Sequence, residues 1–405
     1  MNLINKYLPE HNLNVFFLNI LLVLGVASFI LFFFVINTGG VRTSLIVCDI
    51  NLVVLILMRA YNPIRYKHIV YTVIITLFLV IPSFFISGVY TNISTIFTVL
   101  KLLGIVLSIH YLTIINNQLS IKVLLKYVLM VLLLLTIICQ FVSCVLFHMP
   151  YGTFSNPHIL GSTSILTLPI VFYFFYTSKS LSKIVFSIVG ILNVITLILS
   201  NSRAAWISIT ISCVFGIIMF LRGTKRWISL LVLVSLLFLI ICIDLRVEMR
   251  LSDLFVNINK QARVFIWNDV IKILEHNKIS EWVWGHGVGI DRTVKYPSYE
   301  VNFPHNFFLE IVYDNGIFGV FLLCVPLSFL FIRLFKDTIK VVKKDDRVFL
   351  CCLLVVFIAW FLDASIVFPF YSKNSLYPFS LILGGMVMYR EMLIQPNVKN
   401  TILLD

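Results

Sequence analysis

Three side chains in the polar parts of this 405-residue chain have the chemistry needed to bind a phosphate group and to move a proton. Arg203 lies in "LSNSRAAW", Arg263 in "NKQARVFIW" and His305 in "NFPHNFFLE". A guanidinium group is planar, stays charged and can hold two phosphate oxygens at once. A neutral imidazole can take a proton from a sugar hydroxyl near pH 7. Together the three residues predict a site where arginines neutralise a leaving diphosphate and a histidine activates a hydroxyl.

The rest of the chain is too apolar for a soluble protein. It is 60% hydrophobic and only 12% charged, whereas about a quarter of the residues of a soluble chain are charged. A helix needs about 20 apolar residues to cross a bilayer, and lipid offers no hydrogen-bond partner to an unpaired backbone. We therefore expect an all-α, polytopic integral membrane protein with about twelve spans. The apolar runs are 14–36, 43–58, 69–88, 94–115, 121–148, 158–177, 183–200, 204–221, 227–244, 312–332, 348–368 and 376–394.

The distribution of charge predicts the topology. The formal net charge is +13, and with the N-terminus inside, most short loops rich in Lys and Arg face the cytoplasm, as the positive-inside rule requires. Both termini are then cytoplasmic, in the inner membrane of a bacterial cell. Because topology accounts for the basic balance, we expect membrane lipids and no nucleic acid among the partners.

One long polar interval, residues 245–305, falls on the periplasmic side in this topology. Within it, apolar residues follow Val264 at the spacing i, i+3, i+7 and i+10, which predicts an amphipathic helix at the membrane interface. The chain then divides into spans one to nine (1–244), the periplasmic loop (245–305), and spans ten to twelve with a cytoplasmic C-terminus (306–405). A long, partly helical loop of this kind is typical of a functional cap.

Three ionisable residues, Asp49, Lys101 and Asp363, lie inside apolar runs. Such residues are costly in a membrane and mark either a functional site or an ion pair. All three fall in the outer halves of their expected helices, about 10 Å deep at 1.5 Å per residue. They indicate either a structural Lys–Asp pair or a polar cavity that opens to the periplasm beneath the 245–305 loop, and both interpretations stay open.

Each of the three site candidates also has a structural interpretation. Arg203 could anchor a helix end by reaching to lipid headgroups, Arg263 could lie on a solvated helix face, and His305 could cap or pack against the helix that follows it. We expect them to act together because all three fall outside, near the same membrane leaflet.

A metal site would need outer carboxylates spaced as ligands. The paired acids Asp345 and Asp346 fall on the cytoplasmic side in the expected topology. We therefore expect neither a metal nor another cofactor.

Four segments, in this order, resemble the O-antigen ligase family of bacterial membrane glycosyltransferases, which includes lipopolysaccharide O-antigen ligases and the related O-antigen polymerases. They are "GTFSNPHILGS", "NSRAAW", "ARVFIW" followed by a Gly-x-Gly pattern, and "PHNFFLEIVYDNGIFG". The resemblance extends over roughly residues 150–320, and the N-terminal helices agree with the family only in hydropathy.

The resemblance implies a GT-C-like glycosyltransferase that takes a glycan from undecaprenyl diphosphate at the periplasmic face, without a metal. It implies that His305 is the general base on the acceptor hydroxyl and that Arg203 and Arg263 bind the donor diphosphate. Supporting candidates are Asn306, in an orienting role, with Lys101, Asp49 and Asp363.

Three functions remain to be separated. An O-antigen ligase would transfer the glycan to the lipid A–core, and this is the interpretation we favour. An O-antigen polymerase would transfer it to another lipid-linked repeat unit. A transporter or flippase for the lipid-linked glycan is the alternative from another class, but such proteins are often built from two repeats joined by a long central link. Here the link between the sixth and seventh runs is about five residues by inspection of the sequence.

Overall fold

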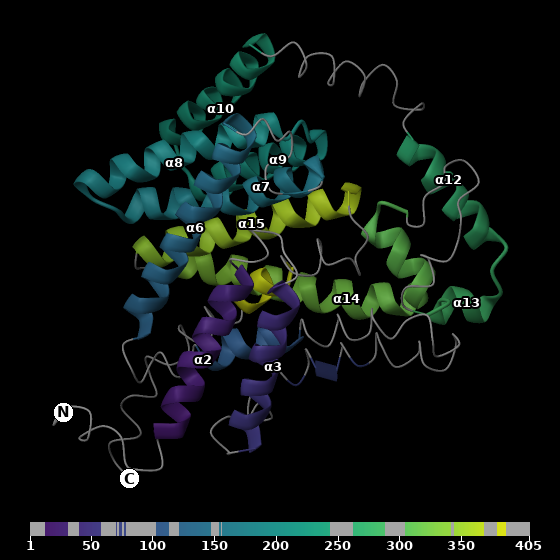
Figure 1. Ribbon diagram of the computed structural model, residues 1–405. Coiled ribbons are helices and arrows are strands. Elements are labelled where there is room, and N and C mark those ends of the chain that lie inside the picture. The colour runs from purple at the N-terminus through teal and green to yellow at the C-terminus, as the bar shows by residue number, and fades with distance from the viewer. Residues whose placement is uncertain are drawn as a thin grey trace.

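The computed structural model describes most of the helical part of the chain. The described residues are 13–30, 40–57, 70, 73–74, 77, 103–112, 121–146, 154, 156–243, 262–287, 304–341, 344–367 and 379–385. Within them every regular element is a helix (Figure 1). The named helices are α2 (Leu13–Ile30), α3 (Gly40–Leu57), α6 (Ile121–Val145), α7 (Pro157–Thr177), α8 (Ser180–Leu199), α9 (Arg203–Phe220), α10 (Thr224–Ile243), α12 (Ala262–Glu275), α13 (Ile279–Trp284), α14 (Phe307–Lys340) and α15 (Lys344–Val367).

Five helices in the described part of the chain are long and apolar enough to cross a membrane, namely α7, α8, α9, α14 and α15. Shorter apolar helical stretches occupy residues 18–28, 45–57, 103–112 and 133–145. The protein is therefore a helical membrane protein, as its composition predicts. The count of twelve spans and the GT-C-like arrangement stay predictions.

Helix α15 forms the centre of the described bundle. In Figure 1 it lies between α7 and α9 on one side and α14 on the other, and it packs against all three. In both α7 and α15, 61% of the apolar stretch is buried, against 28% in α8 and α9. The residues that α15 contributes to the main apolar core are Leu350, Leu354, Val356, Phe357, Ala359, Trp360 and Ala364. Helices α7 and α15 are thus interior, while α8 and α9 leave more apolar surface for lipid.

The starts of α7 and α9 approach each other closely. A Cβ atom built on Gly161 of α7 would lie 2.8 Å from the Cβ of Ser202 and 2.9 Å from the Cβ of Ala205. Both distances are shorter than carbon atoms tolerate, so a glycine is needed for the two helices to meet at this depth. The turn that leads into α9 is itself buried, because Ser200 and Ser202 have no exposed surface.

Helices α12 and α13 pack beside the first part of α14, at the right of Figure 1. Ile266, Val270 and Leu274 of α12 are buried in a small apolar cluster with Tyr313 of α14. A helix therefore occupies the stretch where the spacing predicts one. Leu274 of the predicted apolar face lies in this cluster, while Ile271 of the same face is 45% exposed, and the location of the helix at the membrane interface stays a prediction.

Helix α14 contains a kink at Gly316, where φ is 63° and ψ is −171°. The turn after α13 supplies donors to the carbonyl groups just before this kink. The backbone N–H of His286 donates to the Tyr313 carbonyl at 3.0 Å, and that of Gly287 donates to the Asp314 carbonyl at 2.8 Å. Carbonyl groups at an interruption of a helix need such partners, so the turn fastens α13 to α14.

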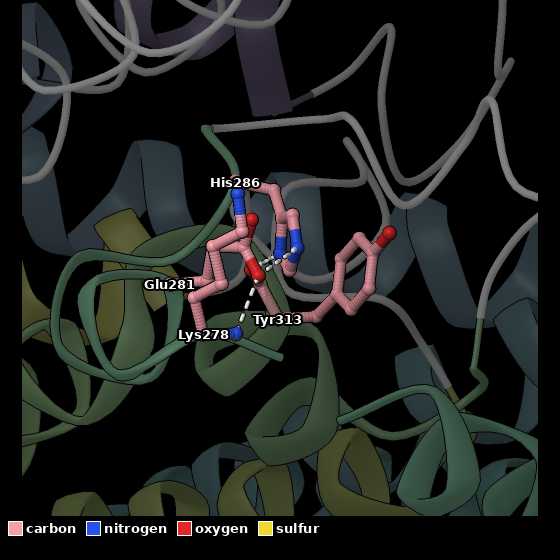
Figure 2. Close-up of polar contacts among 4 residues, drawn as sticks. All are labelled: Lys278, Glu281, His286 and Tyr313. Atoms are coloured by element: carbon pink, nitrogen blue, oxygen red, sulfur yellow. Dashed lines mark hydrogen bonds and ion pairs between the residues drawn. The ribbon is translucent and has the colours of Figure 1, made fainter. Parts of the chain in front are cut away.

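The side chain of His286 strengthens the same junction (Figure 2). Its Nδ1 lies 3.0 Å from the Tyr313 carbonyl oxygen, and its ring stacks on the Tyr313 ring with centroids 4.4 Å apart. On the other side, the Glu281 carboxylate accepts from the Lys278 backbone N–H at 2.8 Å and lies 4.0 Å from His286 Nε2. The junction of α13 and α14 is therefore held by both backbone and side chains.

Gly285 gives a test of this junction. Its φ is 75°, and an added Cβ would meet the backbone of Asp314 and Asn315. Gly285→Ala should therefore lower the free energy of unfolding by more than ~1–2 kcal/mol, which is what a left-handed conformation alone costs an ordinary residue. The measurement is the thermal unfolding midpoint of the purified protein in detergent.

Gly223→Ala is the matched control, because Gly223 also has a positive φ, of 60°, but nothing lies within 4 Å of an added Cβ. Equal losses of stability in the two variants would show that the steric contact with α14 contributes nothing.

Candidate functional site

The N-terminal ends of α7, α9 and α12 meet at one place through the ring of His158. Its Nδ1 lies 3.1 Å from the Ser202 Oγ at the start of α9. Its Nε2 lies 3.3 Å from an Nη2 nitrogen of Arg263, in the first turn of α12. Three segments that are far apart in the sequence therefore converge within hydrogen-bond distance.

The start of α14 joins the same region. His305 Nδ1 lies 3.0 Å from the carbonyl oxygen of Val367, the last residue of α15. Trp267 of α12 donates its Nε1 hydrogen to the Pro304 carbonyl at 2.9 Å. Arg263 is also close enough to His305 to lower its pKa. Four helix starts and the end of α15 thus surround one site.

Asparagine caps explain why α7 and α14 begin where they do. The Asn156 side chain accepts from the His158 backbone N–H at 2.8 Å, with a proline in the first turn of α7. The Asn306 side chain accepts from the Phe308 N–H at 2.9 Å and the Leu309 N–H at 3.2 Å. Asparagine is among the preferred residues at this position, because its side chain satisfies the first free N–H groups of a helix. Asn306 therefore ends the loop and leaves His305 just outside α14.

Ser202 caps α9 differently. It occupies the position before the helix, but its side chain makes no capping hydrogen bond to α9. Instead its hydroxyl oxygen contacts the His158 ring across the interface with α7. The hydroxyl thus joins two helices where it would ordinarily stabilise one.

The geometry of His305 fixes which of its ring nitrogens carries the hydrogen in the neutral form. A carbonyl oxygen can only accept, so the contact with Val367 requires a hydrogen on Nδ1, and the neutral ring then has a lone pair on Nε2. His305 has a φ of 51°, a left-handed conformation that costs a non-glycine residue about 1–3 kcal/mol and is concentrated at functional sites. The fold therefore holds a strained histidine whose neutral ring carries its lone pair on Nε2.

The surroundings keep His305 neutral. Burial lowers its pKa, the hydrogen bond to the Val367 carbonyl opposes that shift, and the charge of Arg263 lowers the pKa further. The net direction of the pKa is below the ordinary value of a histidine, which favours the neutral ring near pH 7.

Arg203 and Arg263 lie within electrostatic range of each other. Burial lowers the pKa of Arg263, the guanidinium of Arg203 lowers it further, and the carboxylate of Asp363 opposes both effects. Two like charges in a partly buried place repel each other. An anion between them would relieve that repulsion, so the pair is suited to a negatively charged ligand.

Asp363 comes from α15 and lies one turn before Val367. It is only 2% exposed, and its Oδ2 is hydrogen-bonded to the Ser162 hydroxyl. The same hydroxyl lies 2.9 Å from the His158 carbonyl oxygen. The Asp363 Oδ1 has no hydrogen-bond partner within the described ranges. The structure thus places this predicted residue in the site, beside Arg263.

The remaining candidates are not brought to this region by the described contacts. The Asp49 carboxylate lies against Gly104 of the 103–112 helix, where an added Cβ would overlap it. Lys101 lies outside the described residues, so the predicted Lys–Asp pair stays a prediction.

Sequence reasoning did not single out His158. The residue stands in "GTFSNPHILGS", and the Asn-Pro-His order there is a recognisable helix start. Nothing in that local pattern indicates a contact with Arg263, which is 105 residues further along the chain. Only the packing of α7 against α9 and α12 reveals it.

The arrangement combines cations, helix starts and a neutral base. Helix N-termini carry partial positive charge and attract anions. Within the stretches that the structure describes, no group of three or more His, Cys, Asp or Glu side chains is placed to hold a metal ion. The expectation of a metal-independent reaction stays a prediction.

Comparisons with known proteins agree with the resemblance found in the sequence. Residues 186–324 match the family model described as O-Antigen ligase. The chain is also 25% identical over 256 residues to the ComP-specific O-oligosaccharyltransferase of Acinetobacter baylyi. That alignment covers 60% of this chain and 43% of the relative, so this chain spans less than half of the relative's length.

Asp363 gives a test of the electrostatic balance in the site. At alkaline pH, where the Asp363 carboxyl is ionised, Asp363→Asn keeps the side-chain size but removes the negative charge that acts on Arg263, so we expect it to destabilise the protein by about 1–3 kcal/mol. The thermal unfolding midpoint in detergent measures this loss. Asp345→Asn, an exposed position in the first turn of the same helix, should cost less. A loss of equal size at Asp345 would contradict the stabilising role of the Asp363 charge.

Proposed function

We propose, from the resemblance of the chain to the O-antigen ligase family, that the protein is a membrane glycosyltransferase that takes its glycan from undecaprenyl diphosphate. The reaction takes place at the periplasmic face of the bacterial inner membrane, with both termini in the cytoplasm and the 245–305 loop over the site. The observation that carries the proposal is the meeting of two guanidinium groups and four helix starts beside a neutral histidine.

The donor diphosphate suits the cationic side of this site. Arg203 and Arg263 supply fixed positive charge, and each can bind two oxygens in a bidentate manner. The starts of α7, α9, α12 and α14 add partial positive charge from their backbone dipoles. A diphosphate between the arginines would relieve their mutual repulsion. It would also become a better leaving group as its developing charge is neutralised.

His305 suits the proton transfer. The acceptor hydroxyl oxygen attacks the anomeric carbon of the donor sugar and forms the new glycosidic bond. The bond between that carbon and the diphosphate oxygen breaks, and its electron pair leaves with undecaprenyl diphosphate. The hydroxyl proton goes to Nε2 of His305, which carries the lone pair of the neutral ring. General base catalysis of this kind contributes about 10²–10⁴ in rate.

The acceptor distinguishes the members of this group of enzymes. We propose lipid A–core, which makes the protein an O-antigen ligase in lipopolysaccharide biosynthesis. A lipid-linked repeat unit would make it an O-antigen polymerase. The name of the Acinetobacter baylyi relative, an O-oligosaccharyltransferase specific for ComP, adds a third kind of acceptor.

The lipopolysaccharide of a deletion strain separates these acceptors. Loss of all O-antigen from the core indicates a ligase. A core that carries a single repeat unit indicates a polymerase. Unchanged lipopolysaccharide would contradict both and favour an acceptor of the third kind.

His305→Asn tests the base directly. Asparagine tolerates a positive φ well, so the variant should fold, but it has no nitrogen that can take the proton. We expect transfer from the lipid-linked donor by the purified protein to fall by about 10²–10⁴. The matched control is His276→Asn, at an exposed residue near the end of α12, and it should leave transfer unchanged.

The pH profile gives an independent measure of the same residue. Transfer requires the neutral ring, so activity falls as the pH drops through the pKa of His305. Because that pKa is lowered, the acid limb should have its midpoint below the 6.5 of an ordinary histidine, and His305→Asn should lack this limb. A midpoint above 6.5, or near-normal transfer by the variant, would reject His305 as the base.

Arg203→Lys tests the bidentate role of the arginine. Lysine keeps the charge but loses the planar fork, and a hydrogen bond to a charged group contributes about 1.5–3 kcal/mol. We expect kcat/KM for the donor to fall by roughly 10–100-fold. Arg226→Lys is the control, since Arg226 donates its Nε hydrogen to the Leu221 carbonyl at 2.9 Å, away from the site. Full activity of Arg203→Lys would show that charge alone matters at this position.

A further inference from the structure

The ring of His158 contacts both Ser202, the residue before α9, and Arg263 of α12, and its chemistry is restricted by these partners. An arginine guanidinium can only donate hydrogen bonds. The contact of 3.3 Å between the Arg263 Nη2 and the His158 Nε2 therefore requires a lone pair on Nε2. The neutral ring then carries its hydrogen on Nδ1, which can donate to the Ser202 Oγ at 3.1 Å. A protonated ring would present an N–H group to the guanidinium, so the contact exists only with neutral His158.

The ring is fixed from several directions. Asn156 caps the helix start that carries it, and the Ser162 hydroxyl lies 2.9 Å from its backbone carbonyl oxygen. Gly161 allows α9 to approach, which brings Ser202 to the ring. His158 is therefore a rigid acceptor, whereas an arginine side chain has many rotamers that cost entropy to restrict.

A neutral acceptor has a consequence that a carboxylate would not have. A carboxylate in place of His158 would orient Arg263 but would also neutralise its charge and compete with a diphosphate for the guanidinium. The imidazole nitrogen orients the guanidinium and leaves its full positive charge available for the ligand. The charge of Asp363 already offsets part of the charge of Arg263. A second anion at position 158 would lower the net positive charge of the site further.

We infer that His158 is a positioning residue for Arg263, a neutral hydrogen-bond acceptor that holds the guanidinium in the orientation that receives the donor diphosphate. The inference rests on the proposed function, since it assigns His158 a role in donor recognition. It places one residue from the first resembling segment, "GTFSNPHILGS", in direct contact with another from the third, "ARVFIW".

Three substitutions separate the parts of this role. His158→Gln retains an acceptor at about the distance of Nε2, so it should keep donor affinity within about 3-fold. His158→Asn reaches only as far as Nδ1, so it should weaken donor affinity by about 10-fold or more, the effect of a lost hydrogen bond to a charged group. His158→Asp should also weaken affinity, because its charge competes with the diphosphate.

The experiment measures binding of undecaprenyl diphosphate to the purified full-length protein in detergent, together with kcat and donor KM for transfer. The loss in His158→Asn should appear in binding and in donor KM, with kcat changed less. His276→Asn is the matched control, and it should bind the probe as the wild type does. Unchanged binding by His158→Asn, or equal weakening by His158→Gln and His158→Asn, would overturn the inference.

A double-mutant cycle distinguishes positioning from a structural role. If His158 acts through the Arg263 guanidinium, His158→Asn should weaken donor affinity only slightly in an Arg263→Lys background. The effects of substitutions at two residues in contact are not additive. A structural role would give the same loss in both backgrounds and would overturn the inference. Thermal unfolding midpoints verify that each variant is folded, and His158→Gln keeps the test decisive if His158→Asn is unstable.

The wild-type protein separates failure of this inference from failure of the proposed function. A wild type that neither binds undecaprenyl diphosphate nor transfers glycan would overturn the proposed function and the inference with it. A wild type that binds the probe, with variants that bind equally well, would leave the function intact and remove only the role of His158.

Discussion

The arrangement of the site depends on one unfavourable interaction, the repulsion between the guanidinium groups of Arg203 and Arg263 in a partly buried place. Other features of the fold make this repulsion tolerable. Asp363 lies near enough to offset part of it, and His158 holds one guanidinium without removing its charge. The attraction of both guanidinium groups to an anion would offset the remaining repulsion, so the pair is suited to an anionic ligand.

Helix ends hold the interacting groups in place. The side chains of Asn156 and Asn306 cap the starts of α7 and α14. The Ser202 side chain makes no capping hydrogen bond to α9 and contacts the His158 ring. The end of α15 supplies the carbonyl that fixes the His305 ring. Since a helix end has unpaired backbone groups, each of these contacts serves both the helix and the site.

The sequence predicts part of this well. Hydropathy identifies a helical membrane protein, and Arg203, Arg263 and His305 are recognisable because charged and titratable groups stand out in an apolar chain. The helix α12 was predicted from its spacing, but its packing against Tyr313 of α14 was not, because helical spacing does not say whether lipid, loop or another helix covers a given face. His158 was not singled out, because its significance comes from contacts with segments that follow it by 44 and 105 residues.

The junction between α13 and the kink of α14 has a mechanical consequence. Because backbone bonds and the His286 ring fasten α13 to α14, and α12 shares an apolar cluster with Tyr313, α12, α13 and the first turns of α14 form one stiff unit. The first turn of α14 also packs on α15, with the rings of Phe307 and Phe361 5.3 Å apart between centroids, so that unit is anchored to the centre of the bundle. The contact between the guanidinium of Arg263 and the ring of His158 is therefore supported from behind by apolar packing, and a ligand that bound there would meet a wall with little freedom to yield.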